Sequence, residues 1–225
     1  MRRHAIILLL ALSMVFASCS SSTFFAKGPS DIQSIALVTP YAYLTDAFGD
    51  WSTTYLPSAS RFNSELVSDI VMTSLGLPIQ EEVAFGFDFS DPDPRLGPWL
   101  RNLSRIDSDE ARTLVIPEEI RTAVRQSGCP YGMIITDVGY VKNSDQLAME
   151  RVLEATSRVL EYVINGSMNM SRNTEAYTNG VYALVFDSQT GHVVWFGTRP
   201  RQYNRNPLDH VSLMRQLNTL FKDFR

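Results

Sequence analysis

The order of apolar and polar residues predicts a succession of strands and helices from residue 32 to the end of the chain. Nearly continuous apolar runs are typical of strands buried on both faces, and alternating runs are typical of exposed strands. On this basis the predicted strands cover residues 32–39, 83–89, 133–141, 181–187 and 192–197. Apolar residues at helical spacing predict helices at about 58–75, 98–103, 117–126, 144–164 and 207–225.

These elements predict a single domain of the α+β or α/β class that spans residues 32–225. Its centre is a mixed sheet of about four to five strands with a C-terminal β-hairpin, and three to four helices pack against it. We expect Ser58 or Ser60 to cap the first long helix and Asn206 to cap the last one. Phe62 and Val211 belong to the apolar stripes that should face the core.

Residues 41–57 (YAYLTDAFGDWSTTYLP) follow Pro40 and are expected to form a long loop rich in aromatic residues. Long loops in compact domains are often functional, and ligands of open α/β sheets bind beyond the carboxyl ends of strands. Tyr43, Trp51 and Tyr55 are therefore candidates for stacking on a ligand or a partner. The alternative is that these side chains simply cap the edge of the sheet.

The first nineteen residues, MRRHAIILLLALSMVFASC, run from two arginines through an apolar stretch to small residues and Cys19. This order is typical of a secretory signal, and the apolar stretch is shorter than the roughly 20 residues that span a membrane. Residues 16–19, Phe-Ala-Ser-Cys, resemble the lipobox of bacterial lipoproteins, with Phe16 at the position where leucine is usual.

The lipobox resemblance implies that residues 1–18 are a signal peptide and that Cys19 carries a diacylglyceryl anchor. Ser20, rather than aspartate, follows the cysteine, which favours the outer membrane. Residues 19–31 begin with a serine-rich stretch and are expected to form a flexible tether. The alternative is ordinary secretion with cleavage after Ala17, which would leave Cys19 as a free thiol.

Charge and cysteine content exclude some classes of partner and of structure. Without residues 1–18 the chain has 18 basic and 24 acidic residues, so it offers no electrostatic footprint for nucleic acid. Arg199, Arg201 and Arg205 form a modest basic segment, which is either a solvated rim or a contact for an anionic glycan or phosphate. With Cys19 lipidated, Cys129 has no partner for an intrachain disulfide, and its position after a helix end does not suit a nucleophile.

Candidate catalytic residues are few. After residue 18 the chain has two histidines, His192 and His210, so a Ser-His-Asp or Cys-His site must use one of them. No Gly-x-Ser-x-Gly, His-Glu-x-x-His or phosphate-loop motif is present, and the sequence predicts no cofactor. Asp88, Asp91 and Asp93 are spaced as ligands of a hard cation, but the glycine and distal acid of a calcium loop are missing, which favours a solvated acidic turn.

The segment 183–195 (ALVFDSQTGHVVW) consists of an apolar strand, an aspartate, a Thr-Gly turn and a second strand with a tryptophan. It resembles the hairpin of small bacterial envelope domains such as the amino-terminal domain of TolB, CsgG and LpoB. These domains also open with a strand like residues 35–38 and an amphipathic helix like residues 62–75. The resemblance implies a non-catalytic domain that binds another envelope protein, and it transfers no catalytic or ligand-binding residue.

The sequence therefore predicts a lipid-anchored accessory protein of the bacterial cell envelope, held at the membrane by Cys19 and bound to another envelope protein. One alternative is an envelope hydrolase that acts on glycan or peptide. A second alternative is a ligand-binding protein that uses the aromatic residues of 41–57. A cleft that holds a histidine beside a serine, cysteine or aspartate favours the hydrolase, whereas an exposed apolar patch favours a partner protein.

Overall fold

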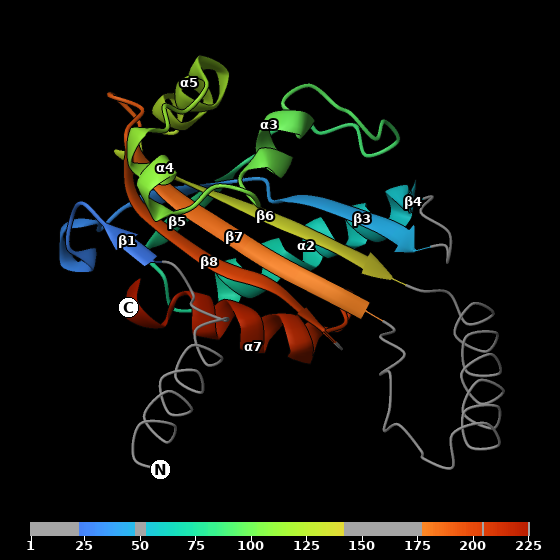
Figure 1. Cartoon of the computed structure of the whole chain (residues 1–225). Coiled ribbons are helices and arrows are strands. Elements are labelled where there is room, and N and C mark those ends of the chain that lie inside the picture. The colour runs from blue at the N-terminus through green and yellow to red at the C-terminus, as the bar shows by residue number, and fades with distance from the viewer. Residues whose placement is uncertain (1–22, 48–52, 142–176, 204, 225) are drawn as a thin grey trace, which may run out of the picture.

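The computed structural model describes residues 23–47, 53–141, 177–203 and 205–224, which form one mixed sheet and the helices around it (Figure 1). The strands are β1 (Thr23–Phe25), β2 (Ile35–Val38), β3 (Tyr41–Ala47), β4 (Thr53–Tyr55), β5 (Ile79–Val83), β6 (Tyr131–Val141), β7 (Tyr177–Asp187) and β8 (Val193–Tyr203). The α-helices are α2 (Pro57–Thr73), α3 (Gly97–Asn102), α4 (Ser108–Thr113), α5 (Glu118–Gln126) and α7 (His210–Leu220), with 3-10 helices η1 (Pro29–Asp31) and η2 (Lys222–Phe224). The helix predicted at 144–164 lies outside the described residues.

The sheet has eight strands and is built around β6, β7 and β8. The strand order is β1-β8-β7-β6-β2-β5, in which β1, β8, β7 and β6 are antiparallel neighbours and β2 runs parallel to both β6 and β5. Farther along the same edge of β6, β3 also pairs in parallel, and β4 pairs with β3. The predicted mixed α/β sheet with its hairpin is confirmed, but four to five strands are too few.

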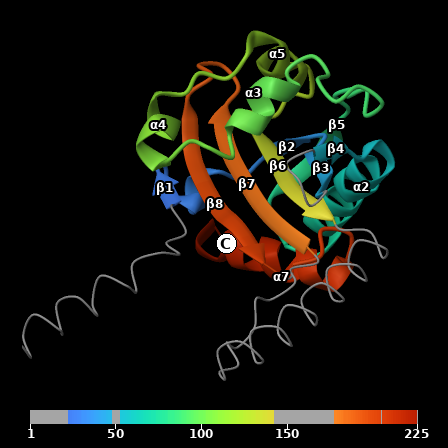
Figure 2. The same cartoon turned by 45° about the vertical axis from the view of Figure 1, so that its right-hand side comes forward.

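Helices cover both faces of this sheet (Figures 1 and 2). On one face α2 and α7 pack against β2, β6, β7 and β8, and on the other face α3, α4 and α5 do so. Ile35 and Leu37 point into the core under α2 and α7, whereas Ala36 and Val38 point into the core under α3, α4 and α5. Because β2 is covered on both faces, its sequence is a continuous apolar run rather than an alternating one.

The described residues of 41–57 form β3, β4 and the start of α2 rather than the expected long loop. Pro40 does end β2, but Tyr41 pairs with Thr136 and the chain continues as β3 along β6. Aromatic and β-branched residues suit such a half-buried strand as well as they suit a binding loop, so their type did not separate the two interpretations. The exposed strand predicted at 83–89 is also misplaced, because β5 ends at Val83.

The ends of three segments differ from the prediction. Residues 23–25 were expected in the tether but pair with β8 as β1, so the fold begins earlier than residue 32. Helix α2 has no side-chain cap, because its N-cap residue is Leu56, and both Ser58 and Ser60 lie within the helix. Ser60 is buried and accepts a hydrogen bond from the Leu44 amide of β3. Helix α7 begins at His210 and is capped by Asp209 rather than Asn206.

Two residues expected in the core are largely exposed. Phe62 of α2 is 51% exposed and Val211 of α7 is 47% exposed. The buried apolar positions of the same helices are Val67, Ile70 and Val71 in α2 and Leu213, Leu217 and Leu220 in α7. Both helices therefore present an apolar residue to solvent beside a well-packed inner stripe.

Candidate functional site

The hairpin of β3 and β4 brings two of the predicted aromatic residues together. Thr45 pairs with Tyr55 in the ladder, and the rings of Tyr43 and Tyr55 stack with centroids 5.0 Å apart and planes inclined by 20°. Offset stacking at this separation stabilises an aromatic pair beyond its buried area. Trp51, the third predicted aromatic residue, lies outside the described residues.

Arg101 of α3 lies over this aromatic pair. Its guanidinium carbon is 4.5 Å from the centroid of the Tyr43 ring, a cation–π distance, and it forms an ion pair with Asp93. One guanidinium nitrogen also donates hydrogen bonds to the Tyr41 hydroxyl at 3.2 Å and to the Pro92 carbonyl at 2.8 Å. Burial raises the pKa of Tyr41 to about 12, and the bond from Arg101 offsets only part of this effect. Tyr41 is thus a neutral anchor for the arginine.

The aromatic contacts continue from Tyr41 into the segment that follows β5. Tyr41 meets Phe87 edge-on with centroids 5.3 Å apart, and Phe87 lies 5.2 Å from Phe85. Phe85 and Phe87 are partly exposed, whereas Tyr41 is buried. We call this partly exposed set the aromatic–arginine surface; it comprises Tyr43, Tyr55, Phe85, Phe87 and Arg101.

A hollow of about 370 Å³ lies beside the aromatic–arginine surface. Phe85 and Phe87 line it together with Arg95 and Glu119, whose side chains form an ion pair at 2.5 Å. This volume is at the low end for small-molecule sites, which are typically about 300–1,000 Å³ and bury most of their ligand. Its mixture of rings and charged side chains suits a side chain or short segment of a partner protein.

The acidic turn beside this hollow is internally satisfied. Asp88 accepts hydrogen bonds from the amide and hydroxyl of Ser90, and these bonds lower the pKa of Asp88. Asp91 accepts from the amide of Asp93, whose own carboxylate pairs with Arg101. The described residues contain no group of three or more histidine, cysteine, aspartate or glutamate side chains that could hold a metal ion.

The predicted basic segment does not form one patch. Arg199 lies in β8, and its side chain donates to the carbonyl of Thr219 in the last turn of α7 at 3.2 Å. Arg201 is exposed and close enough to Tyr182 to act on its ionisation: burial raises the pKa of Tyr182, and the charge of Arg201 partly offsets this rise. The two arginines therefore have different surroundings: Arg199 is bonded to the end of α7, and Arg201 is exposed.

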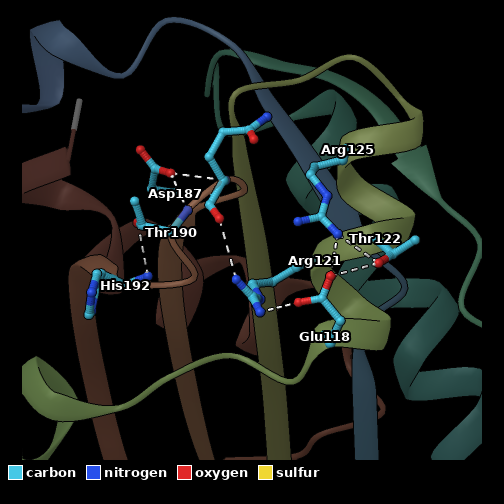
Figure 3. A network of polar contacts seen from close by, with 8 residues as sticks. Glu118, Arg121, Thr122, Arg125, Asp187, Thr190 and His192 are labelled. Atoms are coloured by element: carbon cyan, nitrogen blue, oxygen red, sulfur yellow. Dashed lines mark hydrogen bonds and ion pairs between the residues drawn. The ribbon is translucent and has the colours of Figure 1, made fainter.

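The turn between β7 and β8 holds a polar network (Figure 3). The carboxylate of Asp187 accepts from the amides of Gln189 and Thr190, and Arg121 of α5 donates to the carbonyl of Gln189 at 3.3 Å. These bonds explain the Asp-x-x-Thr-Gly spacing as turn chemistry. His192 takes part through its backbone amide, which donates to the Thr190 hydroxyl, and its imidazole is exposed.

The remaining candidates for nucleophilic chemistry lie apart from one another. His210 is the exposed first residue of α7, and His192 is at the β7–β8 turn. Cys129 is buried, and its sulfur accepts a 3.6 Å hydrogen bond from Ser34. Within the described part of the chain, neither imidazole is hydrogen-bonded to a serine, cysteine or aspartate side chain.

A buried polar cluster, absent from the sequence prediction, lies between the sheet and α2. Asp137 of β6 accepts hydrogen bonds from Asn63 at 2.9 Å and from Asn179 of β7 at 3.1 Å, and all three side chains are inaccessible. Asn63 also donates to the Pro207 carbonyl at 2.6 Å, which ties the segment before α7 to α2. Burial raises the pKa of Asp137 to about 7 against the effect of both bonds. The signal in the sequence was an aspartate inside the apolar run 133–141.

Comparisons with known proteins give little further information. No protein-family model and no curated protein matches the sequence. Among solved structures, the PelC dodecamer from Paraburkholderia phytofirmans matches with 11% identity and a TM-score of 0.40 over 91% of this chain and 96% of that one. The L103M variant of that dodecamer gives 11% identity and a TM-score of 0.42 over 92% and 98%. Similarity at this level carries no inference about function or assembly.

Proposed function

We propose that the protein is a lipid-anchored, non-catalytic interaction protein of the bacterial cell envelope, attached through Cys19 to the outer membrane. The observation that carries this proposal is the lipobox-like sequence Phe-Ala-Ser-Cys at the end of an apolar signal, followed within four residues by the first strand of the domain. No helix among the described residues is long and apolar enough to cross a membrane. A diacylglyceryl group provides durable attachment, because two acyl chains hold a protein at a bilayer where one does so marginally.

The aromatic–arginine surface supports a protein partner. Interfaces are enriched in tyrosine, phenylalanine and arginine, and residues of these types dominate binding energy when they are desolvated. Here Phe85 and Phe87 are partly exposed and line an open hollow, and Tyr55 is partly exposed against Tyr43. Arg101 is already positioned by Asp93 and Tyr41. Such a preorganised surface loses little side-chain entropy on binding.

The two alternative functions receive less support. A ligand stacked on Tyr43 would compete with Tyr55 and Arg101, which already contact this ring. A hydrolase that uses His192 or His210 would need a nucleophile beside an exposed imidazole, and the described neighbours of these residues supply none. The partner-binding proposal needs no rearrangement of these side chains.

Site-specific photocrosslinking in intact cells tests the partner surface. A photoreactive phenylalanine analogue at Tyr55 or Phe87 should give a discrete crosslinked protein, whereas the same analogue at Val115, which is 53% exposed, should not. Tyr55→Ala should weaken capture of the same protein by a tag on this chain. Equal crosslinking at all three positions would contradict the assignment of the surface.

A separate measurement tests the anchor. Wild-type protein should partition into the detergent phase of a membrane extract, and Cys19→Ala should move it to the aqueous phase. A matched substitution, Ser20→Ala, retains the cysteine and should leave partitioning unchanged. Detergent-phase partitioning of the Cys19→Ala protein would contradict lipid attachment.

A further inference from the structure

The distance between the anchoring residue and the folded domain is short. Three residues separate Cys19 from Thr23, the first residue of β1. An extended chain spans about 3.5 Å per residue, so Thr23 lies within about 14 Å of Cys19. A domain of this length has a diameter of about 40 Å, roughly three times that reach. A lipid on Cys19 therefore keeps one particular side of the domain, the side around β1, next to the bilayer.

Two helices flank β1 on opposite faces of the sheet. On one face α4 approaches it, and the guanidinium of Arg112 lies 4.5 Å from the ring centroid of Phe24. On the other face Phe25 packs against Trp195 at 6.4 Å, and Trp195 in turn meets Phe221 and Phe224 at the end of α7. Either the α4 flank or the α7 flank can therefore turn toward the lipid.

The charges of the two flanks differ in sign. The α4 flank carries the exposed acids Asp107, Asp109 and Glu110 against the two arginines Arg105 and Arg112. Asp107 and Glu110 form a capping box at the helix start, so their carboxylates are held in place. With three acids against two arginines, this flank has no excess of positive charge to attract the anionic headgroups of a bacterial membrane.

The α7 flank has a small excess of basic residues: Arg199, Arg215 and Lys222 outnumber the acids Asp209 and Asp223. Helix α7 contains no acidic residue, and it presents Arg215, with Lys222 in the following turn. Arg199 reaches the same helix end through its bond to Thr219, and the opposing acid there is Asp223. Phe25, 38% exposed, stands beside this basic end of the helix. Three cations and an exposed aromatic ring match a lipid headgroup region, where basic residues bind phosphate and rings insert at the boundary.

We infer that the face formed by α7, η2 and Phe25 lies against the membrane, with Arg199, Arg215 and Lys222 binding the phosphates of lipid headgroups. This inference rests on the proposed anchor at Cys19. It also gives the domain a fixed orientation. The aromatic–arginine surface belongs to the side of the sheet covered by α3, α4 and α5 and points away from the bilayer, toward an envelope partner (Figure 2).

Fluorescence quenching in reconstituted vesicles tests this orientation. Lipidated protein is placed in vesicles of phosphatidylethanolamine and phosphatidylglycerol that contain a headgroup-linked quencher. Single cysteines carry a fluorophore at Thr219 on α7, at Thr113 on α4 and at Gln80 on β5, all of which are exposed. Unsubstituted protein measures the background from the buried Cys129. We expect quenching several-fold stronger at Thr219 than at Thr113 or Gln80.

Charge reversal supplies the second arm of the experiment. Arg215→Glu combined with Lys222→Glu should bring quenching at Thr219 down toward the value at Thr113, while the protein still floats with the vesicles. Equal quenching at Thr219 and Thr113 in floating wild-type protein would overturn the orientation and leave the anchor standing. Wild-type protein that fails to float would overturn both the anchor and this inference.

Discussion

Replacing Asp137 by asparagine is expected to stabilise the protein at and above neutral pH. The Asp137 carboxyl is fully buried and joins β6, β7 and α2 through Asn63 and Asn179, and it takes part in no ion pair among the described residues. One carboxyl oxygen accepts both amide bonds, and the other has no partner. An asparagine carbonyl can accept the same two bonds, and its NH₂ group adds a donor where the bare oxygen stands.

The size and sign of the effect follow from proton linkage. In the folded protein the pKa of Asp137 is about 7, well above its ordinary value near 4. Between these two values the folded chain binds a proton that the unfolded chain has lost, so the carboxyl lowers stability progressively as the pH rises through this window. With 1.36 kcal/mol for each pKa unit, ionisation costs about 4 kcal/mol above pH 7, an upper bound because water enters partly opened sites.

The assay is urea unfolding of wild type and Asp137→Asn at several values between pH 4 and pH 8. The difference in unfolding free energy between the two proteins should grow in favour of Asp137→Asn from pH 4 to pH 7 and then level off. Asp187→Asn is the matched control, because backbone bonds from Thr190 and Gln189 outweigh burial and lower the pKa of Asp187. This control should show no growing advantage over the same range. Parallel curves for wild type and Asp137→Asn would refute the burial of an unpaired carboxyl.

Three further substitutions test the packing and the turns. Trp195→Ala removes a fully buried ring that stacks on Phe221 and meets Phe224 edge-on, and it should lower the unfolding free energy by about 3–5 kcal/mol in denaturant titrations. At Gly191, where φ is +74°, an alanine methyl group would lie 2.6 Å from the side chain of Arg121, so Gly191→Ala should lower the unfolding free energy by about 1–3 kcal/mol. Gly128→Ala has a similar φ of +80° but open space around the methyl group, so it should lower the unfolding free energy by less in the same titration. Asp107→Ala removes both bonds of the α4 cap and should cost about 0.5–2 kcal/mol, seen as a lower thermal midpoint; an unchanged midpoint would contradict the cap.

Several elements of the fold could be predicted from the sequence because each one has a local pattern that is specific to its conformation. The continuous apolar runs at Ile35–Val38 and within β6 reflect coverage on both faces, and the Thr-Gly turn at 190–191 reflects a positive φ at Gly191. The stripe of α2 around Ile70 reflects its packing on the sheet. Each of these elements has a period or a turn residue that belongs to one conformation.

The errors arose where the decisive contact lies far along the chain. Residues 41–47 form a strand because they pair with the edge of β6, and not because of their local composition. The first pair in this ladder, Tyr41 and Thr136, is about 95 residues apart in the sequence. Residues 23–25 form a strand rather than part of a tether because they pair with β8, which is also distant in the sequence. Long-range pairing of this kind leaves no local pattern.

The candidate site was predictable only in part. Tyr43 and Tyr55 were identified by residue type, and the structure brings them together, but Arg101 was missed because nothing in the sequence places α3 over β3. Arg199 and Arg201 look like one basic segment, yet the side chain of Arg199 is bonded to the end of α7, whereas that of Arg201 is exposed. Neighbouring positions in the sequence therefore did not reveal that these two arginines differ, and the aromatic–arginine surface depends on contacts between residues far apart in the sequence.

The chemical state of the mature N-terminus tests the central claim most directly. Mass spectrometry of the N-terminal peptide from protein purified out of membranes should show Cys19 as the first residue, with the added mass of a diacylglyceryl group. An unmodified peptide that begins at Ser18, the product of cleavage after Ala17, would contradict lipid anchoring.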